Sequence, residues 1–146
     1  MKDYLNERVK FRETFRPYAP TVLAEHAAAW FDMGDDTHSP YMLRVVDVPP
    51  DKAARIPAVV HVDGTARVQT LTREQNPGYR AVVEAFHELT GVPVILDTSF
   101  NLAGKPIVET PKDAVDCFEA TLIDALLVGP WLLTKAPLPA DTAGLS

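Results

Sequence analysis

The sequence predicts a single α/β domain built around a twisted mixed sheet of parallel and antiparallel strands. Short apolar runs with β character alternate along the chain with segments whose apolar residues recur at helical spacing. Between two of the apolar runs, Asp63-Gly64 is a tight-turn dipeptide, which predicts a hairpin and makes the sheet mixed. The 146 residues match the length of one domain, and 47% hydrophobic residues are enough for a real core.

The first half of the chain is predicted to hold two helices and several extended segments. The second helix is alanine-rich, and Pro49-Pro50 ends the β-rich segment that follows it. The predicted elements are a helix at 1–7, an extended segment at 15–22, a helix at 23–31, a polar loop at 34–40 and strands at 41–48, 56–62 and 66–71.

The second half carries clearer helix signals. Asn76-Pro77 and Thr110-Pro111 each place a capping side chain before a proline, and Gly91 marks the end of the first of these helices. The side chains predicted to be buried are Tyr79, Val82, Val83, Phe86 and Leu89 on the first helix, and Ala114, Phe118 and Leu122 on the second. Residues 92–96 are predicted as a fully buried strand and 125–134 as a last strand interrupted by Gly129-Pro130. The domain is expected to span 1–135, with 136–146 as a loose tail.

Composition narrows the function classes. No apolar run approaches the ~20 residues that span a bilayer, and the N-terminus lacks a secretory h-region, so we expect a cytoplasmic protein without membrane contact. The net charge of −6 argues against nucleic-acid binding. A single cysteine, Cys117, excludes an internal disulfide and is expected to be a buried, inert thiol. The four histidines show no metal-ligand spacing, so no metal site is predicted.

A basic cluster near the N-terminus is the first candidate site. If residues 8–16 are extended, Arg8, Lys10, Arg12 and Arg16 share one side of the strand. Such a row of cations suits a phosphate, which arginine binds bidentately and lysine as a point charge. A solvated strand face neutralised by nearby glutamates explains the same pattern equally well.

The segment around the Asp63-Gly64 turn is the second candidate. Thr65 offers a hydroxyl, and Arg67 beside the turn would pair with a phosphate or a carboxylate. A plain hairpin in which Asp63 neutralises Arg67 is the alternative, and it would be favoured for this segment in isolation.

The third candidate is Asp97-Thr98-Ser99-Phe100-Asn101, at the end of a predicted buried strand. Ser99 and Asn101 are two residues apart, so they point the same way and could bind one phosphate or sugar hydroxyl. Turn chemistry, in which both satisfy local backbone groups, is the alternative.

Taken in order, these motifs resemble the C-terminal domain of the nodulation and antibiotic O-carbamoyltransferase family. The match begins with Lys10-x-Arg12-x-x-x-Arg16-Pro17 and Ser39-Pro40-Tyr41-Met42. It continues through the turn segment with Thr65 and Arg67, then Thr98-Ser99-Phe100-Asn101, and it covers about residues 1–135.

The resemblance implies a YrdC-like fold and a half-reaction that makes carbamoyl-adenylate from ATP, with its Mg²⁺, and carbamoyl phosphate. A separate Kae1-like carbamoyltransferase N-terminal protein would then pass the carbamoyl group to an acceptor hydroxyl, as in natural product biosynthesis. Carried over by motif, Lys10 and Arg67 would be catalytic. The residues implied to bind phosphate or nucleotide are Lys10, Arg12, Arg16, Thr65, Arg67, Ser99 and Asn101, with no metal ligand in the protein.

Three departures support an alternative, a catalytically silent nucleotide-binding or scaffolding remnant. Asp97 replaces the asparagine usual in the family, and Lys105 replaces a frequent glutamate. The Kae1-like domain and an upstream arginine segment are not in this sequence, so we expect a truncated, excised or split product.

Overall fold

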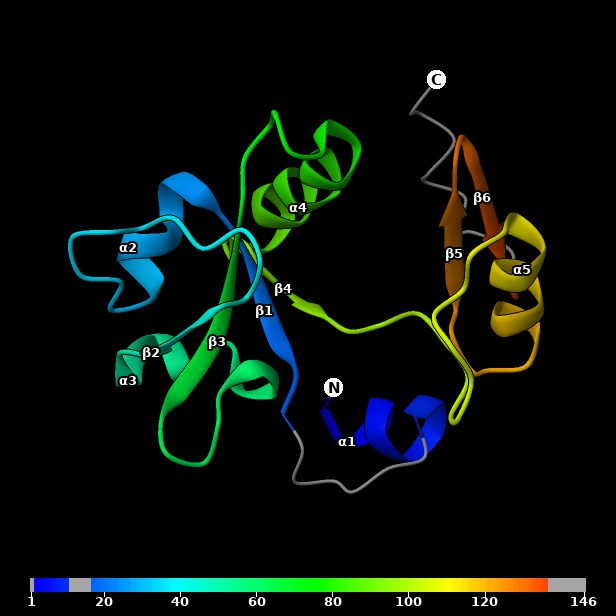
Figure 1. The fold of residues 1–146 in the computed structure, drawn as a ribbon, viewed down its shortest axis with the longest axis horizontal. Helices are drawn as coiled ribbons and strands as arrows, with labels where there is room; N and C mark the ends of the chain where they lie inside the picture. The colour runs from blue at the N-terminus through cyan, green and yellow to red at the C-terminus, as the bar shows by residue number, and fades with distance from the viewer. Residues whose placement is uncertain (1, 11–16, 137–146) are drawn as a thin grey trace. The chain divides into compact units, whose positions relative to one another are not determined.

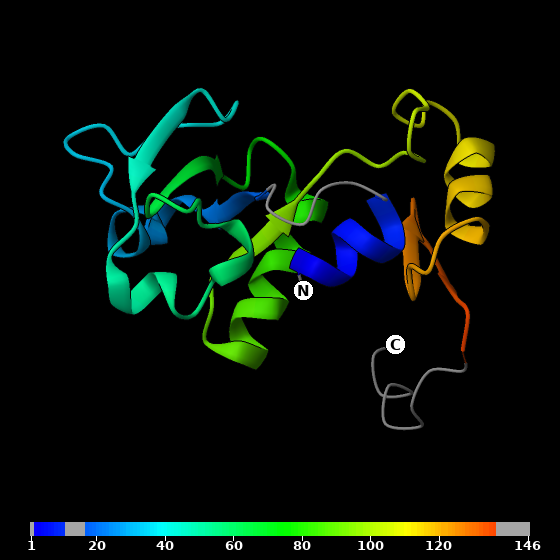
Figure 2. The same cartoon turned by 90° about the horizontal axis from the view of Figure 1, so that it is seen from below.

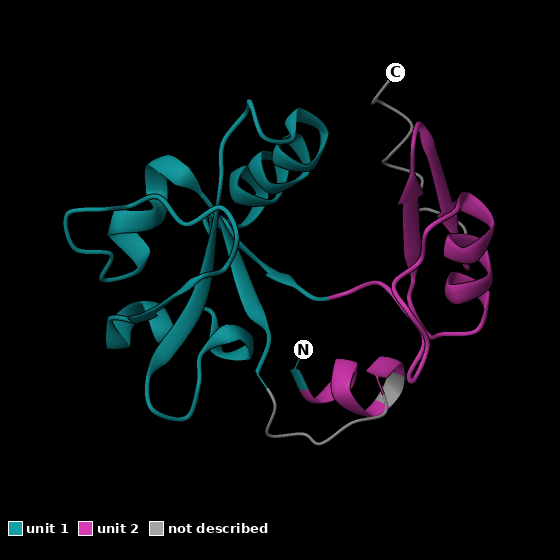
Figure 3. Ribbon diagram, viewed as in Figure 1, with its two compact units in different colours: residues 1–2, 14–98 teal, residues 3–13, 99–146 magenta. Residues whose placement is uncertain are grey.

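The computed structural model describes residues 2–10 and 17–136, apart from the side chain of Arg8. Its helices and its mixed parallel and antiparallel strand pairing confirm the predicted α/β class. The chain divides into two compact units, which Figure 3 shows in different colours. Unit 1 consists of residues 1–2 and 14–98, and unit 2 of residues 3–13 and 99–146.

A four-stranded sheet forms the centre of unit 1 (Figure 1). The strands are β1 (Ala19–Leu23), β2 (Arg44–Asp47), β3 (Thr65–Leu71) and β4 (Val94–Asp97). Their order is β2-β3-β1-β4. The pair β1–β3 is parallel, whereas β1–β4 and β2–β3 are antiparallel. The sheet is therefore mixed. Its strand β1, the first in the chain, lies between β3 and β4, which come much later.

The predicted strand at 56–62 is wrong. Its residues form a single 3-10 turn, η3 (Pro57–Val59), in which the Val59 amide donates to the Ile56 carbonyl at 3.1 Å. Pro57 has a fixed φ and no N–H, which favours such a turn over a ladder position. The tight turn itself is present, with Gly64 at φ 84°, but the antiparallel partner of β3 is β2. A short helix that the sequence did not predict, α3 (Pro50–Ala53), begins in the Pro49-Pro50 dipeptide.

Both faces of the sheet bury apolar side chains. On one face, Leu23 and Leu71 pack with Val83 of α4 (Pro77–Thr90), and Tyr79 and Ile95 lie against them. On the other face, the buried strand side chains are Val22, Val46, Ala66, Val68 and Val94. The alanine-rich segment forms two short helical pieces, η2 (Ala24–His26) and α2 (Ala27–Trp30), in place of one helix.

Helix α4 begins and ends as predicted. The Asn76 side chain accepts a hydrogen bond from the Tyr79 amide at 3.0 Å, and Gly91 ends the helix at φ 69°. The predicted buried stripe is wrong, however, because only Val83 is fully buried and Leu89 is 86% exposed. The helix residues that pack against the strands, Tyr79 and Val83, both lie in its first half.

Unit 2 begins with a continuous helical segment, drawn in blue in Figure 2. It consists of α1 (Lys2–Leu5), whose first residue is assigned to unit 1, and the π-helical turn η1 (Asn6–Lys10). The Tyr4 hydroxyl donates to the Leu122 carbonyl at 3.1 Å, which ties this segment to the C-terminal part of the unit.

The C-terminal part of unit 2 holds α5 (Pro111–Glu119), β5 (Ala125–Val128) and β6 (Trp131–Thr134). Thr110 and Asp113 form the capping box that starts α5, and Ala114 and Phe118 are buried as predicted. Two predictions are wrong. Residues 125–134 form an antiparallel hairpin that turns at Gly129-Pro130, and Leu122 lies beyond α5 with half of its surface exposed. Residues 137–146 lie outside the described part, so the loose tail stays a prediction.

Candidate functional site

The predicted site residues fall into both units. Lys10, Ser99 and Asn101 belong to unit 2, whereas Thr65 and Arg67 belong to unit 1. Arg12 and Arg16 lie outside the described residues.

Lys10, Ser99 and Asn101 come together although they are about 90 positions apart in the chain. The Lys10 ammonium donates to the Ser99 carbonyl and, at 2.9 Å, to Asn101 Oδ1. The Ser99 hydroxyl donates to the same Oδ1 atom, also at 2.9 Å. The Asn101 amide group is oriented by its donation from Nδ2 to the Lys105 carbonyl at 2.8 Å.

Two donors thus converge on one neutral oxygen atom. Hydrogen bonds from an ammonium are stronger when the acceptor is itself charged. An anionic oxygen in place of Asn101 Oδ1 would therefore satisfy the same two donors better than the amide does. This arrangement suits a phosphate or carboxylate oxygen.

The basic cluster was predicted on the assumption that residues 8–16 are extended, and this is wrong for residues 8–10. Residues 6–10 are helical rather than extended, so the alternation argument does not place Lys10. Lys10 is the last residue of η1, and the helix end brings its ammonium to residues 99–101. The rest of the proposed strand, residues 11–16, lies outside the described part of the chain.

Thr65 is engaged within its own turn. Its hydroxyl donates to Asp63 Oδ1 at 2.7 Å and lies 2.9 Å from His61 Nδ1, and its amide donates to the same Asp63 oxygen at 3.1 Å. The two bonds from Thr65 hold the pKa of the Asp63 carboxyl below its usual value. Asp63 therefore serves the turn and does not neutralise Arg67, contrary to the plain-hairpin alternative.

Arg67 is exposed on β3, on the same face as Gln69, which lies two residues further along. Within residues 2–10 and 17–136, its side chain makes no hydrogen bond and no ion pair. A guanidinium in this state keeps its donors available for an anion.

Several polar side chains lie together on the face of the sheet that carries Arg67, and the sequence drew attention only to Asp97 and Gln69 among them. Thr21, which is fully buried, places its hydroxyl 3.1 Å from Gln69 Oε1 and 3.4 Å from Asp97 Oδ2. Burial raises the pKa of the Tyr79 phenol, a hydrogen bond with Thr21 opposes this, and the charge of Asp97 adds to it. Asp97 is unusual in the sequence, but its hydrogen-bond partner Thr21 lies on β1, and its neighbours Gln69 and Tyr79 lie on β3 and α4. Strand register and the packing of α4 on the sheet bring these side chains together, and the sequence shows neither.

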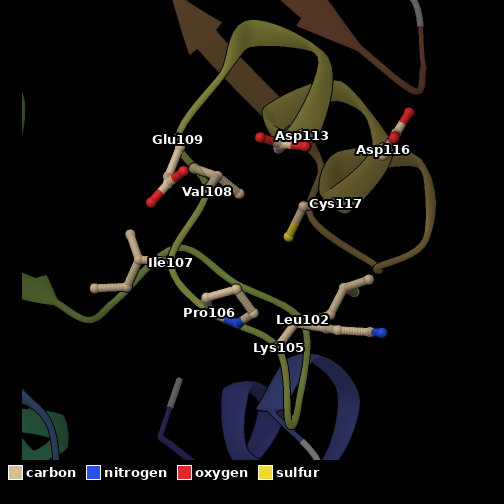
Figure 4. Close-up of a pocket in the computed structure, with 9 residues that line it drawn as sticks. All are labelled: Leu102, Lys105, Pro106, Ile107, Val108, Glu109, Asp113, Asp116 and Cys117. Atoms are coloured by element: carbon tan, nitrogen blue, oxygen red, sulfur yellow. The ribbon is translucent and has the colours of Figure 1, made fainter.

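A pocket of about 470 Å³ lies in unit 2, and Figure 4 shows the side chains that line it. Its wall combines apolar and charged side chains: Leu102, Lys105, Pro106, Ile107, Val108, Glu109, Asp113, Asp116 and Cys117. Asp113 is used in the capping box and Asp116 pairs with Lys112 at 2.5 Å. Glu109 is a third carboxylate on this wall and Lys105 is its one cation, so the pocket lining would repel a phosphate.

Cys117 is 3% exposed, which agrees with the predicted buried thiol. Burial raises its pKa, and the positive charge of Lys10 opposes the shift. Since the thiolate is the reactive form, we expect iodoacetamide at pH 7.5 to alkylate the folded chain about ten-fold or more slowly than the urea-unfolded chain. Mass spectrometry of timed samples measures both rates, and equal rates would contradict this assignment.

The described residues include neither a metal-binding cluster nor a membrane-spanning helix. They contain no group of three His, Cys, Asp or Glu side chains close enough to hold a metal ion. None of the described helices is long and apolar enough to cross a bilayer.

Comparison with known proteins identifies relatives over nearly the whole chain. Residues 1–135, which include parts of both units, match the family described as carbamoyltransferase C-terminus. Nodulation protein NolO of Bradyrhizobium diazoefficiens is 45% identical over 137 residues, which cover 93% of this chain and 25% of that protein. Nodulation protein NolNO of Sinorhizobium fredii is 47% identical over 135 residues, covering 92% and 20%.

Nodulation protein U of Rhizobium tropici is 42% identical over 135 residues, covering 92% of this chain and 22% of that protein. The chain therefore spans only about a fifth to a quarter of the length of these relatives.

Proposed function

The chain belongs to the carbamoyltransferase C-terminal family, and on that premise we propose that it binds ATP and carbamoyl phosphate and forms carbamoyl-adenylate. A separate Kae1-like polypeptide would transfer the carbamoyl group to an acceptor hydroxyl. The observation that carries the proposal is the convergence of the Lys10 and Ser99 donors on one oxygen position.

The proposed reaction has two steps. Water displaces the phosphate of carbamoyl phosphate as inorganic phosphate and leaves carbamate. A carbamate oxygen then attacks the α-phosphorus of ATP, and pyrophosphate leaves. Negative charge builds on phosphate oxygens in such a step, so fixed cations and hydrogen-bond donors stabilise the transition state without a protein nucleophile.

Each site residue has a proposed part in this chemistry. Lys10 is proposed as the catalytic cation of unit 2, with Ser99 and Asn101 binding phosphate oxygens beside it. Arg67 is the proposed cation of unit 1, and Thr65 acts mainly by ordering the turn that precedes it. Arg12 and Arg16 are proposed to bind phosphate on the strength of the motif alone.

The donor set fits a nucleotide that brings its own metal ion. The described residues supply no three-ligand cluster, and Mg²⁺ is commonly held by substrate phosphates with few protein ligands. Mg²⁺ bound to ATP would neutralise part of the phosphate charge.

The test is release of pyrophosphate and inorganic phosphate by the purified chain with ATP and Mg²⁺, with and without carbamoyl phosphate. We expect equal amounts of both products, and only when carbamoyl phosphate is present. Ser99→Ala should lower this release about ten-fold, because it removes a donor to a charged group. Carbamoyl phosphate-dependent release that is unchanged in Ser99→Ala would contradict the site.

A second candidate, nucleotide binding without turnover, is favoured by one observation. Asp97 adds a carboxylate on the face of the sheet that carries Arg67. Equilibrium dialysis separates the two proposals, since ATP binding without any pyrophosphate release, with or without a Kae1-like partner, would support the silent module.

A further inference from the structure

Asp97 and Arg67 lie on one face of the unit 1 sheet, with β1 between them. Asp97 of β4 is the register partner of Ala19. In the parallel pair β1–β3, Thr21 is level with Gln69, which puts Arg67 level with Ala19 as well. Strands lie about 4.8 Å apart, so the two Cα atoms are about 10 Å apart. One methyl group, that of Ala19, separates the carboxylate from the cation at this level of the sheet.

The two opposite charges do not neutralise each other directly. Among the described residues, the Arg67 side chain makes no ion pair, and the Asp97 carboxylate accepts one hydrogen bond, at 3.4 Å, from Thr21. The Gln69 amide donates to the Pro40 carbonyl at 2.9 Å, which turns its Oε1 atom toward Thr21. The single Thr21 proton therefore goes to Gln69 over the shorter distance, and the Asp97 carboxylate keeps most of its accepting capacity.

An ionised carboxylate only accepts hydrogen bonds, and beside a phosphate it would repel the ligand. A carboxylate stabilises a bound anion only where the ligand directs an N–H or O–H group at the carboxylate. Carbamoyl phosphate carries both features on one short molecule, a phosphate for Arg67 and an amide N–H₂ for Asp97.

We propose that Asp97 is a specificity-determining residue that selects the carbamoyl group by accepting a hydrogen bond from its N–H₂, while Arg67 across Ala19 binds the phosphate of the same molecule. This assignment rests on the proposed function and adds to it a means of rejecting other acyl phosphates. A ligand with a methyl group in place of the amine leaves the Asp97 carboxylate desolvated and without a donor, which is the strongest form of discrimination a binding site offers.

The experiment compares two stable phosphonates that differ only at this position. Phosphonoacetamide carries the N–H₂ group of carbamoyl phosphate, and acetonylphosphonate carries the methyl group of acetyl phosphate. Isothermal titration of the full chain is expected to show about 10- to 100-fold tighter binding of phosphonoacetamide, as for a charged hydrogen bond. Carbamoyl phosphate and acetyl phosphate, tested as freshly prepared competitors, should show the same order.

Variants of Asp97 distinguish a role in ligand preference from a purely structural role. Asp97→Ala should remove the preference by weakening phosphonoacetamide and strengthening acetonylphosphonate, whereas a merely structural role would weaken both equally. Asp97→Asn should keep part of the preference, because its carbonyl oxygen still accepts. Asp51→Ala, which removes an exposed carboxylate of the same unit, is the matched control and should change neither affinity.

Three outcomes would count against the proposal. Phosphonate binding with no preference in the native chain, or a preference that survives in Asp97→Ala, overturns the Asp97 assignment and leaves the proposed function standing. Failure of the native chain to bind either phosphonate or carbamoyl phosphate overturns both.

Discussion

Arg67→Ala is expected to weaken binding of carbamoyl phosphate and of phosphonoacetamide by about 10- to 100-fold. The guanidinium has no partner within the described residues, so its loss removes a ligand contact without breaking an internal one. A hydrogen bond to a charged group contributes about 1.5–3 kcal/mol, which corresponds to that range. Isothermal titration at 0.1 M salt measures the change.

Arg73→Ala is the matched control for Arg67. Arg73 follows β3 at its other end, and its exposed guanidinium pairs with Glu84 at 3.0 Å. Its removal should leave ligand affinity unchanged. Equal losses in the two variants would point to a general effect of net charge and would remove Arg67 from the site.

Lys10→Ala is expected to reduce carbamoyl phosphate-dependent pyrophosphate release by about 100- to 1000-fold. Loss of one preorganised donor to a developing negative charge has an effect of that size in other enzymes. The ammonium also bridges the Ser99 carbonyl and Asn101 Oδ1, so the same change loosens the two neighbouring ligand contacts. Initial rates at several ATP concentrations separate the loss in kcat from the change in KM.

Lys112→Ala controls for the loss of a lysine from the same unit. Lys112 is exposed on α5 and pairs with Asp116, and such a solvated surface contact contributes little to stability. Full activity of Lys112→Ala, together with loss of activity in Lys10→Ala, would support Lys10 as the catalytic cation. Activity retained in Lys10→Ala would place the chemistry elsewhere.

Local signals were predicted well because they depend on residues within one turn. Asn76 and Thr110 cap their helices through amides three residues ahead, and Gly91 supplies a positive φ at the end of α4. No distant part of the chain enters these contacts, so the sequence contains all that is needed. The Gly129-Pro130 turn belongs to the same class, and its two-residue spacing could have predicted the β5–β6 hairpin.

Strand pairing was predicted poorly because it depends on distant residues. Residues 56–62 have the β-branched composition of a strand, yet the edge position beside β3 is taken by β2. Composition states only that a segment suits a sheet, and it does not state which segment will pair with it. The mixed sheet was thus predicted correctly for a reason that the structure does not bear out.

Some residues of the candidate site were predicted from the sequence, and others were not. Lys10, Ser99 and Asn101 were predicted as separate motif residues, and the structure brings these three together. Thr21, Gln69 and Tyr79 were not predicted as neighbours of Asp97, because strand register brings Thr21 and Gln69 toward it and the packing of α4 on the sheet brings Tyr79.

The central position of β1 has a consequence for synthesis of the chain. Both neighbours of β1 in the sheet, β3 and β4, are translated long after it. At about 5–20 residues per second, β1 waits on the order of several seconds before its last partner leaves the ribosome. During that interval its unpaired backbone N–H and C=O groups, and the side chains that the finished fold buries, are open to other chains. Slower translation of residues 24–97 should therefore raise aggregation of the nascent chain, and co-expression of a holdase chaperone should lower it.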